Sequence, residues 1–383
     1  HVAGFYTMMS YGASLGMVPS GKSGKKALRN ISPSIQELKP SVMLSVPTLA
    51  KSFKKNIETT IAKKGKTIEK LYNFALRNAI AYNKEGYHKG TEFVDIFRKP
   101  LMLLFDKLIF KAVRQGLGGN MKFFVGGGAL LDIDLQRYYY AIGIPMYQGY
   151  GLSEATPIIS ANSPAKHIFG SSGKIVSPME IKILDADGVE QPFGVKGEIC
   201  IKGENVMAGY WKNPKSTADT IVDGWLHTGD MGYMRDEEML YVVGRFKSLL
   251  IAADGEKYSP EGIEENLVEN SKYIDGALLH NSQDPYTIAL VTPNKEALKK
   301  YAQELGLDPA SQEAKEKMLL LIESEVNAYR KGGKFAGAFP DRWLPAAICV
   351  LPEPWTEQNH FLNSSMKVVR GRVEEAYKEN MEY

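Results

Sequence analysis

The stretch YQGYGLSEATP, from Tyr147 to Pro157, decides the fold because the segments before it alternate between strand and helix patterns. Upstream lie an apolar segment, Met121 to Val125, and the small-residue run GGGA at 126–129. A helix pattern from Asp132 to Ala141 then leads into the apolar segment Ile142 to Met146, which we expect to be a buried strand. The order strand, glycine turn, helix, strand predicts a parallel α/β sheet, whose ligands bind beyond the carboxyl ends of its strands.

Several residues after these two strands have the chemistry of a nucleotide site. Gly127 and Gly128 leave room for a planar ligand against the backbone, where a Cβ would obstruct it. Tyr150 offers a ring face for stacking, Ser153 a hydroxyl for phosphate, and Glu154 a hard oxygen ligand for Mg²⁺. An ordinary strand end beside a βα turn would explain the same residues, so neither segment is decisive alone.

Four motifs in a fixed order resemble those of the adenylate-forming superfamily, which includes acyl-CoA synthetases, peptide-synthetase adenylation domains and luciferases. They are GGGA, YGLSEATP, HTGD at 227–230, and GRFK at 244–247 followed by SPE at 259–261. The resemblance runs from the first residue to the C-terminus. It implies an adenine-side loop at Gly127, Gly128 and Ala129, with Tyr150 and Gly151 beside the nucleotide and Mg²⁺ on Glu154.

The resemblance assigns two further residues to the ribose. Asp230 supplies a carboxylate suited to a vicinal diol, the chemistry that dinucleotide folds also use. Thr-Gly-Asp by itself is common turn chemistry, so only its place in the motif order favours ribose binding. Arg245, by resemblance, contacts the same sugar.

The resemblance also assigns a hinge and two mobile elements to the C-terminal part. Lys247 is the hinge position about which a small domain rotates, since a few residues can absorb such a change in φ and ψ. Lys367 is the catalytic lysine of the adenylation step, although the preceding Asn-Ser-Ser-Met departs from the usual Thr/Pro/Gly-rich loop. Gly255 and Glu256 belong to the loop that reaches the active site for transfer to CoA.

The fold we expect is α/β: a partial large domain, with a parallel-type α/β sheet and a small β-barrel subdomain, followed by a smaller α+β domain. The domain boundaries are 1–165 for the α/β subdomain, 166–245 for the β-barrel subdomain and 246–383 for the mobile C-terminal domain. The segment from Thr48 to Gly116 has a largely helical pattern. A helical insertion at this point resembles long-chain acyl-CoA synthetases more than members that act on short acids or amino acids.

The N-terminal segment raises two separate questions. Tyr11 to Val18 has the pattern of a buried strand, and Gly16 to Ser23 matches the phosphate-binding pattern GxxxxGK[ST]. Pro19 removes a backbone donor and Pro33 should interrupt a helix begun at Ser23, so we interpret this motif as an exposed basic loop. The superfamily's Thr/Ser/Gly-rich phosphate loop does not occur in the sequence, and we therefore expect the chain to be an N-terminally truncated fragment, inactive alone.

Composition excludes several classes of protein. With 383 residues, 44% hydrophobic and 24% charged, the chain reads as an ordinary soluble protein of two or more domains. A net charge of +3 offers no case for nucleic acid. Cys200 and Cys349 are far apart and lack metal-ligand spacing, which fits a reducing cytoplasm. No apolar run is long enough to span a bilayer, so we expect at most peripheral contact with the inner face of the membrane.

The function we expect by resemblance is that of a long-chain fatty acid–CoA ligase, with ATP, Mg²⁺ and CoA as cofactor and co-substrates. One alternative transfers the acyl group to an acyl carrier protein, whose thiol is the same chemical group. The other is a non-catalytic remnant that binds nucleotide or acyl chains without turnover.

Overall fold

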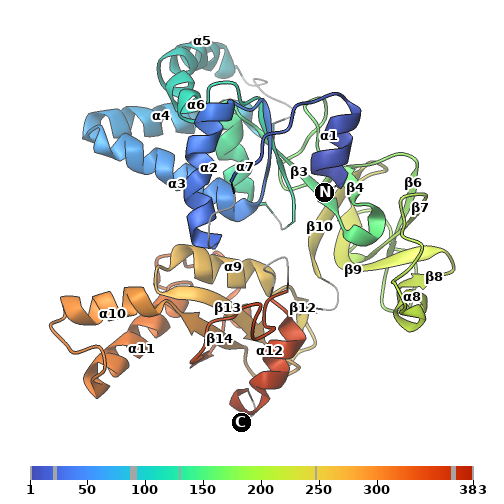
Figure 1. Cartoon of the computed structure of the whole chain (residues 1–383), viewed down its shortest axis with the longest axis vertical. Helices are drawn as coiled ribbons and strands as arrows, with labels where there is room; N and C mark the ends of the chain where they lie inside the picture. Colours follow the sequence, from blue (N-terminus) through green and yellow to red (C-terminus); the bar gives the residue numbers. More distant parts are fainter. Residues whose placement is uncertain are drawn as a thin grey trace. The chain divides into compact units, whose positions relative to one another are not determined.

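A computed structural model describes residues 2–19, 24–86, 93–128, 131–245, 248–363 and 368–381. The chain divides into two compact units, 1–243 and 244–383 (Figure 1). The boundary that we predicted near residue 165 falls inside the sheet of the first unit, between two paired strands. That boundary, and the rotation of a C-terminal domain, stay predictions.

The first unit contains the parallel sheet that the sequence predicts. Strands β1 (Val42–Ser45), β2 (Phe123–Gly126) and β3 (Met146–Gly151) lie side by side and parallel. The glycine turn after β2 and the polar loop after β3 therefore lie at the same edge, because the carboxyl ends of parallel strands meet there. The prediction that the second strand starts at Ile142 was wrong: Ile142 caps the preceding helix, and Gly143 turns the chain with φ of +82°.

Helices account for most of the segment before β2. They are α1 (Thr7–Ser10), α2 (Gly24–Leu38), α3 (Pro47–Lys63), α4 (Lys66–Asn83), α5 (Asp95–Phe105), α6 (Lys111–Gly116) and, after β2, α7 (Ile133–Ala141), with π-helical turns at Val2–Tyr6 and Asp106–Phe110. The helical pattern of 48–116 is thus confirmed. Residues 11–18 form no strand and are exposed, and α2 continues through Pro33, so both of these predictions were wrong. Ser20 to Ser23 of the phosphate-loop pattern lie outside the described residues.

Three buried tyrosines hold these helices together. The Tyr72 hydroxyl donates to the Tyr138 hydroxyl at 2.9 Å, which joins α4 to α7. The Tyr139 hydroxyl donates to the backbone oxygen of Ala50 in α3 at 2.6 Å. Burial raises the pKa of Tyr72 to about 12, so this hydroxyl stays protonated. Each ring therefore contributes apolar area to the core while its hydroxyl remains paired, as buried polar groups require.

Beyond β3 the sheet becomes antiparallel. Its path continues through β4 (Ile158–Ala161), β5 (Gly173–Ile175), β10 (Met239–Arg245), β9 (Trp225–Met234), β7 (Gly197–Gly203) and β6 (Met179–Leu184), and β8 (Ile221–Val222) pairs with β9 beside α8 (Pro214–Thr220) (Figure 1). A second core of isoleucine, leucine and methionine side chains fills this part. The mixed α/β fold with one large sheet agrees with the predicted class.

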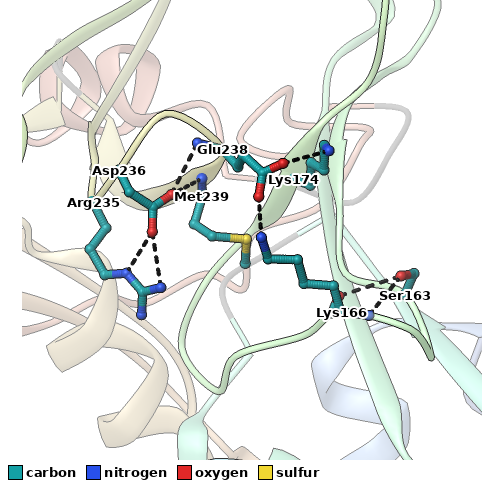
Figure 2. A network of polar contacts seen from close by, with 7 residues as sticks. All are labelled: Ser163, Lys166, Lys174, Arg235, Asp236, Glu238 and Met239. Atoms are coloured by element: carbon teal, nitrogen blue, oxygen red, sulfur yellow. Dashed lines mark hydrogen bonds and ion pairs between the residues drawn. The ribbon is translucent and has the colours of Figure 1, made fainter. Parts of the chain in front are cut away.

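A polar network fastens the turn between β9 and β10 to its neighbours (Figure 2). The Glu238 carboxylate accepts from Lys166 and, at 2.7 Å, from Lys174 of β5, and these ammonium groups lower the pKa of Glu238. Asp236 accepts the backbone N–H groups of Glu238 and Met239 at 3.0 and 2.9 Å. Because these ion pairs are exposed to water, they contribute little to stability, and their role is to fix the turn.

The second unit is a three-stranded sheet covered by helices. Strand β13 (Ile274–His280) pairs antiparallel with β14 (Ile288–Pro293), which pairs parallel with β15 (Ala347–Val350). The helices are α9 (Glu261–Asn270), α10 (Lys295–Glu304), α11 (Gln312–Asn327) and α12 (Arg370–Ala376). Alternate residues of β13 and β14 belong to two different hydrophobic clusters, so both faces of this sheet are packed. Among the described residues of either unit, no helix is long and apolar enough to cross a bilayer.

Candidate active site

The turn after β2 leaves open space beside its backbone. A Cβ added to Gly127 would have its nearest neighbour, the backbone oxygen of Gly149, at 3.8 Å, and one added to Gly128 would lie 3.9 Å from Val46. Gly128 also has a φ of +86°, which favours glycine. These two glycines therefore border room for a flat ligand. Ala129 lies outside the described residues.

Two buried glutamines, which we had not assigned, hold the end of this turn. Gln148 of β3 accepts the backbone N–H of Leu131 at 3.2 Å through its side-chain oxygen. Gln136 of α7 donates to the Leu131 oxygen at 2.9 Å and accepts the N–H of Gly170 at 3.2 Å. Both side chains are at most 4% exposed, so their hydrogen bonds are needed to offset burial of the amides. The only sequence signal is a polar residue at an otherwise apolar position.

Gly151, at the end of β3, is required by the protein's own backbone. A Cβ there would lie 1.7 Å from the oxygen of Pro157. The chain turns back on itself through a 3₁₀ turn, Ser153–Ala155, and Thr156 in the left-handed region with φ of +52°. The close approach of the Pro157 backbone therefore explains why glycine is needed at position 151, with no ligand involved. Beside Gly127, by contrast, no atom of the described residues comes close.

Glu154 is held in place by residues far away in the sequence. Its carboxylate accepts the Tyr210 hydroxyl at 2.9 Å, and its backbone oxygen accepts the Met207 N–H at 2.8 Å. Burial, with the neighbouring carboxylate of Glu154, raises the pKa of Tyr210, so the phenol remains a donor. A carboxylate has about four lone-pair sites, so Glu154 can hold Mg²⁺ while it keeps this hydrogen bond. Ser153, beside it, is exposed.

Tyr150 and Asp230 meet although 80 positions separate them in the sequence. The Tyr150 hydroxyl donates to Oδ2 of Asp230 at 2.6 Å, and both side chains are partly buried. Asp230 stands at an irregularity of β9, where the pairing with β7 shifts register. The structure thus brings together two of the motifs that we assigned to one nucleotide.

A cluster of possible metal ligands lies behind Asp230. Single donor atoms of Glu198, Cys200 and His227 all lie within 4.8 Å of one another. Burial raises the pKa of the Cys200 thiol to about 12, and both carboxylate oxygens of Glu198 accept hydrogen bonds from neighbouring groups. In this structure the three side chains therefore form a hydrogen-bonded network around the His227 ring.

The remaining predicted residues belong to the second unit or lie outside the described residues. Arg245 ends β10 with an exposed side chain. Gly255, with φ of +83°, is in the turn between β11 (Leu250–Ile251) and β12 (Lys257–Tyr258). Next to it, Glu256 accepts from both the Arg342 guanidinium and the Trp343 indole, and the arginine is the main reason that its pKa falls to about 2. Lys247 and Lys367 are among the residues that are not described.

Comparison with known proteins gives one family match and many relatives. The family model described as AMP-binding enzyme matches residues 1–211. Long-chain-fatty-acid–CoA ligase FadD15 of Mycobacterium tuberculosis is 27% identical, over 93% of this chain and 56% of its own length. Long chain acyl-CoA synthetase 8 of Arabidopsis thaliana is 28% identical, over 97% and 52%. The chain thus spans about half the length of the curated relatives that it matches.

Solved structures agree on the fold. The anthranilate CoA ligase AuaEII, in complex with anthranoyl-AMP, has a TM-score of 0.59 at 18% identity and covers 97% of this chain and 54% of its own. The O-succinylbenzoate coenzyme A synthetase MenE of Bacillus subtilis, in complex with AMP, has a TM-score of 0.57 at 20% identity, with 98% and 58% covered. At these identities the likeness concerns the fold alone.

Proposed function

Because the chain belongs to the AMP-binding enzyme family, we propose that the protein activates a long-chain fatty acid with ATP and transfers the acyl group to CoA. The observation that carries the proposal is the hydrogen bond of 2.6 Å between Tyr150 and Asp230. It joins the motif assigned to adenine with the motif assigned to ribose at one edge of the sheet. The names of the long-chain relatives support the substrate class.

Six of the predicted site residues in the first unit have a role in this proposal. The adenine lies in the open space beside Gly127 and Gly128, with the Tyr150 ring against it. The Asp230 carboxylate, oriented by Tyr150, accepts from the ribose diol. Glu154, held by Tyr210, binds Mg²⁺, which supplies neutralising charge beside the phosphates. The exposed Ser153 hydroxyl donates to a phosphate oxygen.

The proposed reaction has two steps. A fatty acid carboxylate attacks the α-phosphorus of ATP, so that pyrophosphate leaves and an acyl-adenylate forms. A thiolate then attacks the acyl carbon, and AMP leaves. We assign Lys367 to the first step, where it would stabilise charge on the phosphate oxygens, and the turn at Gly255 and Glu256 to the second. Rotation at Lys247 would exchange the two elements.

Palmitate-dependent exchange of pyrophosphate into ATP, measured on the full-length gene product and on this chain, tests the first step, and the outcomes below refer to the full-length protein. We expect exchange with palmitate to exceed exchange with acetate by orders of magnitude in kcat/KM, because each buried methylene contributes about 0.8 kcal/mol. Equal rates with both acids would contradict a long-chain substrate. AMP binding without any exchange would favour the alternative of a non-catalytic nucleotide-binding protein. Supplying purified acyl carrier protein in place of CoA separates the two possible acceptors.

We also propose peripheral contact of this protein with a membrane, through the exposed face of the helical segment 95–116. Seven apolar side chains in or just before this segment are at least half exposed: Phe93, Val94, Ile96, Phe97, Leu103, Leu104 and Leu108. The exposed Lys99, Lys107 and Lys111 lie among them along this segment. Of the two acidic residues, Asp95 is buried, and the half-exposed Asp106 is paired with Arg114 through both oxygens.

Apolar side chains among lysines are the composition that binds the surface of an anionic bilayer. Flotation with vesicles tests this proposal: we expect binding to vesicles containing phosphatidylglycerol and much weaker binding to phosphatidylcholine alone. Phe97→Glu should abolish binding. Phe193→Glu, at a phenylalanine of similar exposure elsewhere in the same unit, is the matched control. If Phe97→Glu and Phe193→Glu bind the vesicles equally well, the membrane is rejected as the partner of this face. It is also rejected if Phe97→Glu converts a dimer into a monomer and leaves vesicle binding unchanged.

A further inference from the structure

The strand that presents Asp230 bulges at the Thr-Gly-Asp motif. Glu198 of β7 pairs with Met231 of β9, whereas Cys200 pairs with His227. The three residues from Thr228 to Asp230 therefore lie opposite one residue, Ile199, and the strand must arch. Gly229 takes up the arch with φ of +70°. Bulges of this kind re-aim side chains and are frequent beside active sites.

The backbone groups that leave the ladder are satisfied by side chains. The Thr228 hydroxyl donates to the oxygen of Ile199 at 2.7 Å and accepts the N–H of Asp230 at 3.1 Å. The N–H of Gly229 donates to Oε1 of Glu198 at 3.0 Å. The bulge thus depends on two side chains, one from within it and one from the neighbouring strand.

The second oxygen of Glu198 fixes the residue that begins the bulge. Oε2 lies 2.8 Å from Nδ1 of His227, and because a carboxylate only accepts, the imidazole is the donor. The Glu198 side chain is 15% exposed, so it is largely shielded from water. Cys200 lies against the same ring nitrogen, with Sγ at 3.4 Å. Glu198 therefore holds the bulge at two points, His227 and Gly229.

We infer that Glu198 is a positioning residue for nucleotide binding: it shapes the bulge so that the Asp230 carboxylate faces the ribose diol. This inference rests on the proposed function, in which Asp230 binds the ribose. Glu198 itself does not contact the nucleotide. It acts through the backbone of Gly229, whereas Tyr150 donates directly to the Asp230 carboxylate.

Binding of AMP and of 2′,3′-dideoxy-AMP to the 383-residue chain, measured by calorimetry, tests the inference. We expect Asp230→Ala and Glu198→Ala each to weaken AMP about tenfold, which corresponds to ~1.4 kcal/mol. Both should change the Kd of the dideoxy compound by less than about twofold, because it has no diol. The double variant should bind AMP no more weakly than Asp230→Ala alone, since the two residues act on one contact.

Two further variants guard against loss of the fold. Glu198→Gln keeps an acceptor for the Gly229 N–H, so its Kd should lie between those of the wild type and Glu198→Ala. Glu180→Ala, an exposed glutamate on the adjacent β6, is the matched control and should bind as the wild type does.

The outcomes distinguish failure of the proposed function from failure of the inference about Glu198. If the wild type binds no AMP, the proposed function fails. If Asp230→Ala weakens AMP but both Glu198 variants bind normally, the positioning inference is wrong while the proposed function stands. Additive losses in the double variant, or equal losses for AMP and its dideoxy analogue, would also overturn it, because Glu198 would then act independently of the ribose contact.

Discussion

Alanine at Gly151 and alanine at Gly127 should have opposite consequences, although both glycines belong to the predicted nucleotide site. At Gly151 the added methyl group would meet the Pro157 oxygen at 1.7 Å, a backbone atom that cannot rotate away. At Gly127 the nearest atom would be 3.8 Å away, in ordinary contact, and the backbone is not in the left-handed region. The first substitution should strain the fold, and the second should only fill the space in front of the turn.

The geometry sets the size of both effects. To reach a contact of about 3.2 Å, strand β3 and the Pro157 carbonyl must separate by roughly 1.5 Å, a shift typical of overpacked sites that lose about 1–3 kcal/mol. For a unit of this size, such a loss lowers the Tm by roughly 2–12 °C. Gly127→Ala should stay within about 0.5 kcal/mol of the wild type. Its methyl group would occupy the adenine's place, so AMP binding should weaken about tenfold, or ~1.4 kcal/mol.

Thermal unfolding followed by circular dichroism, together with calorimetric titration of AMP, measures both quantities on the same samples. A wild-type Tm for Gly151→Ala would refute the close return of the chain at Pro157. Normal AMP binding by a stable Gly127→Ala would refute the placement of adenine beside that turn. The two tests are independent, because Gly151→Ala is judged by its Tm and Gly127→Ala by its affinity for AMP.

Three other outcomes are expected. Glu154→Gln should lower the rate of adenylation with little change in Tm. Tyr210→Phe should lower that rate more weakly, by about three- to tenfold, because it removes one hydrogen bond from the Glu154 carboxylate. A large loss of Tm with normal adenylation would make Glu154 a structural residue. The pKa of Glu256 is lowered to about 2, so its contribution to stability should be complete above pH 4.5 and lost as the pH falls towards 2. Arg342→Gln should remove this part of the dependence of Tm on pH. An unchanged dependence of Tm on pH in that variant would contradict the pairing of Arg342 with Glu256. In the full-length protein, Lys367→Ala should abolish acyl-adenylate formation and spare thioester formation from supplied acyl-adenylate, whereas equal loss of both would contradict its assignment.

Much of the fold follows from local sequence patterns. Apolar runs separated by a helix pattern predicted strand β2, the helix after it and a further strand, because side-chain period reports which face of an element is buried. That further strand, β3, begins at Met146, where the predicted one ends, and covers residues that we had predicted to be a loop. The same reasoning failed for residues 11–18, whose apolar side chains are exposed. Pattern alone cannot tell whether a partner strand is available. It also failed at Pro33, which lies inside α2, because a proline disfavours a helix interior without excluding it.

The supporting residues of the candidate site were beyond such patterns. Tyr210 and Glu198 each hold a motif residue through a hydrogen bond, and Gln148 holds Leu131 at the end of the glycine turn. A hydrogen bond needs only an acceptor or donor at the right place in space, so any of several residue types can serve. A glycine in a left-handed turn or against a backbone oxygen has no such substitute.

This difference explains why the Thr-Gly-Asp motif can be recognised in the sequence, whereas Glu198, which holds it, cannot. Gly229 is constrained by its positive φ, Thr228 by a hydroxyl that must both donate and accept, and Asp230 by the ligand we assign to it. All three constraints act within three consecutive residues. The bulge, however, involves two strands. Glu198 takes part because the register shift between β7 and β9 brings its carboxylate within hydrogen-bonding distance of the Gly229 N–H. A residue whose role depends on cross-strand register is found only once the strands are paired.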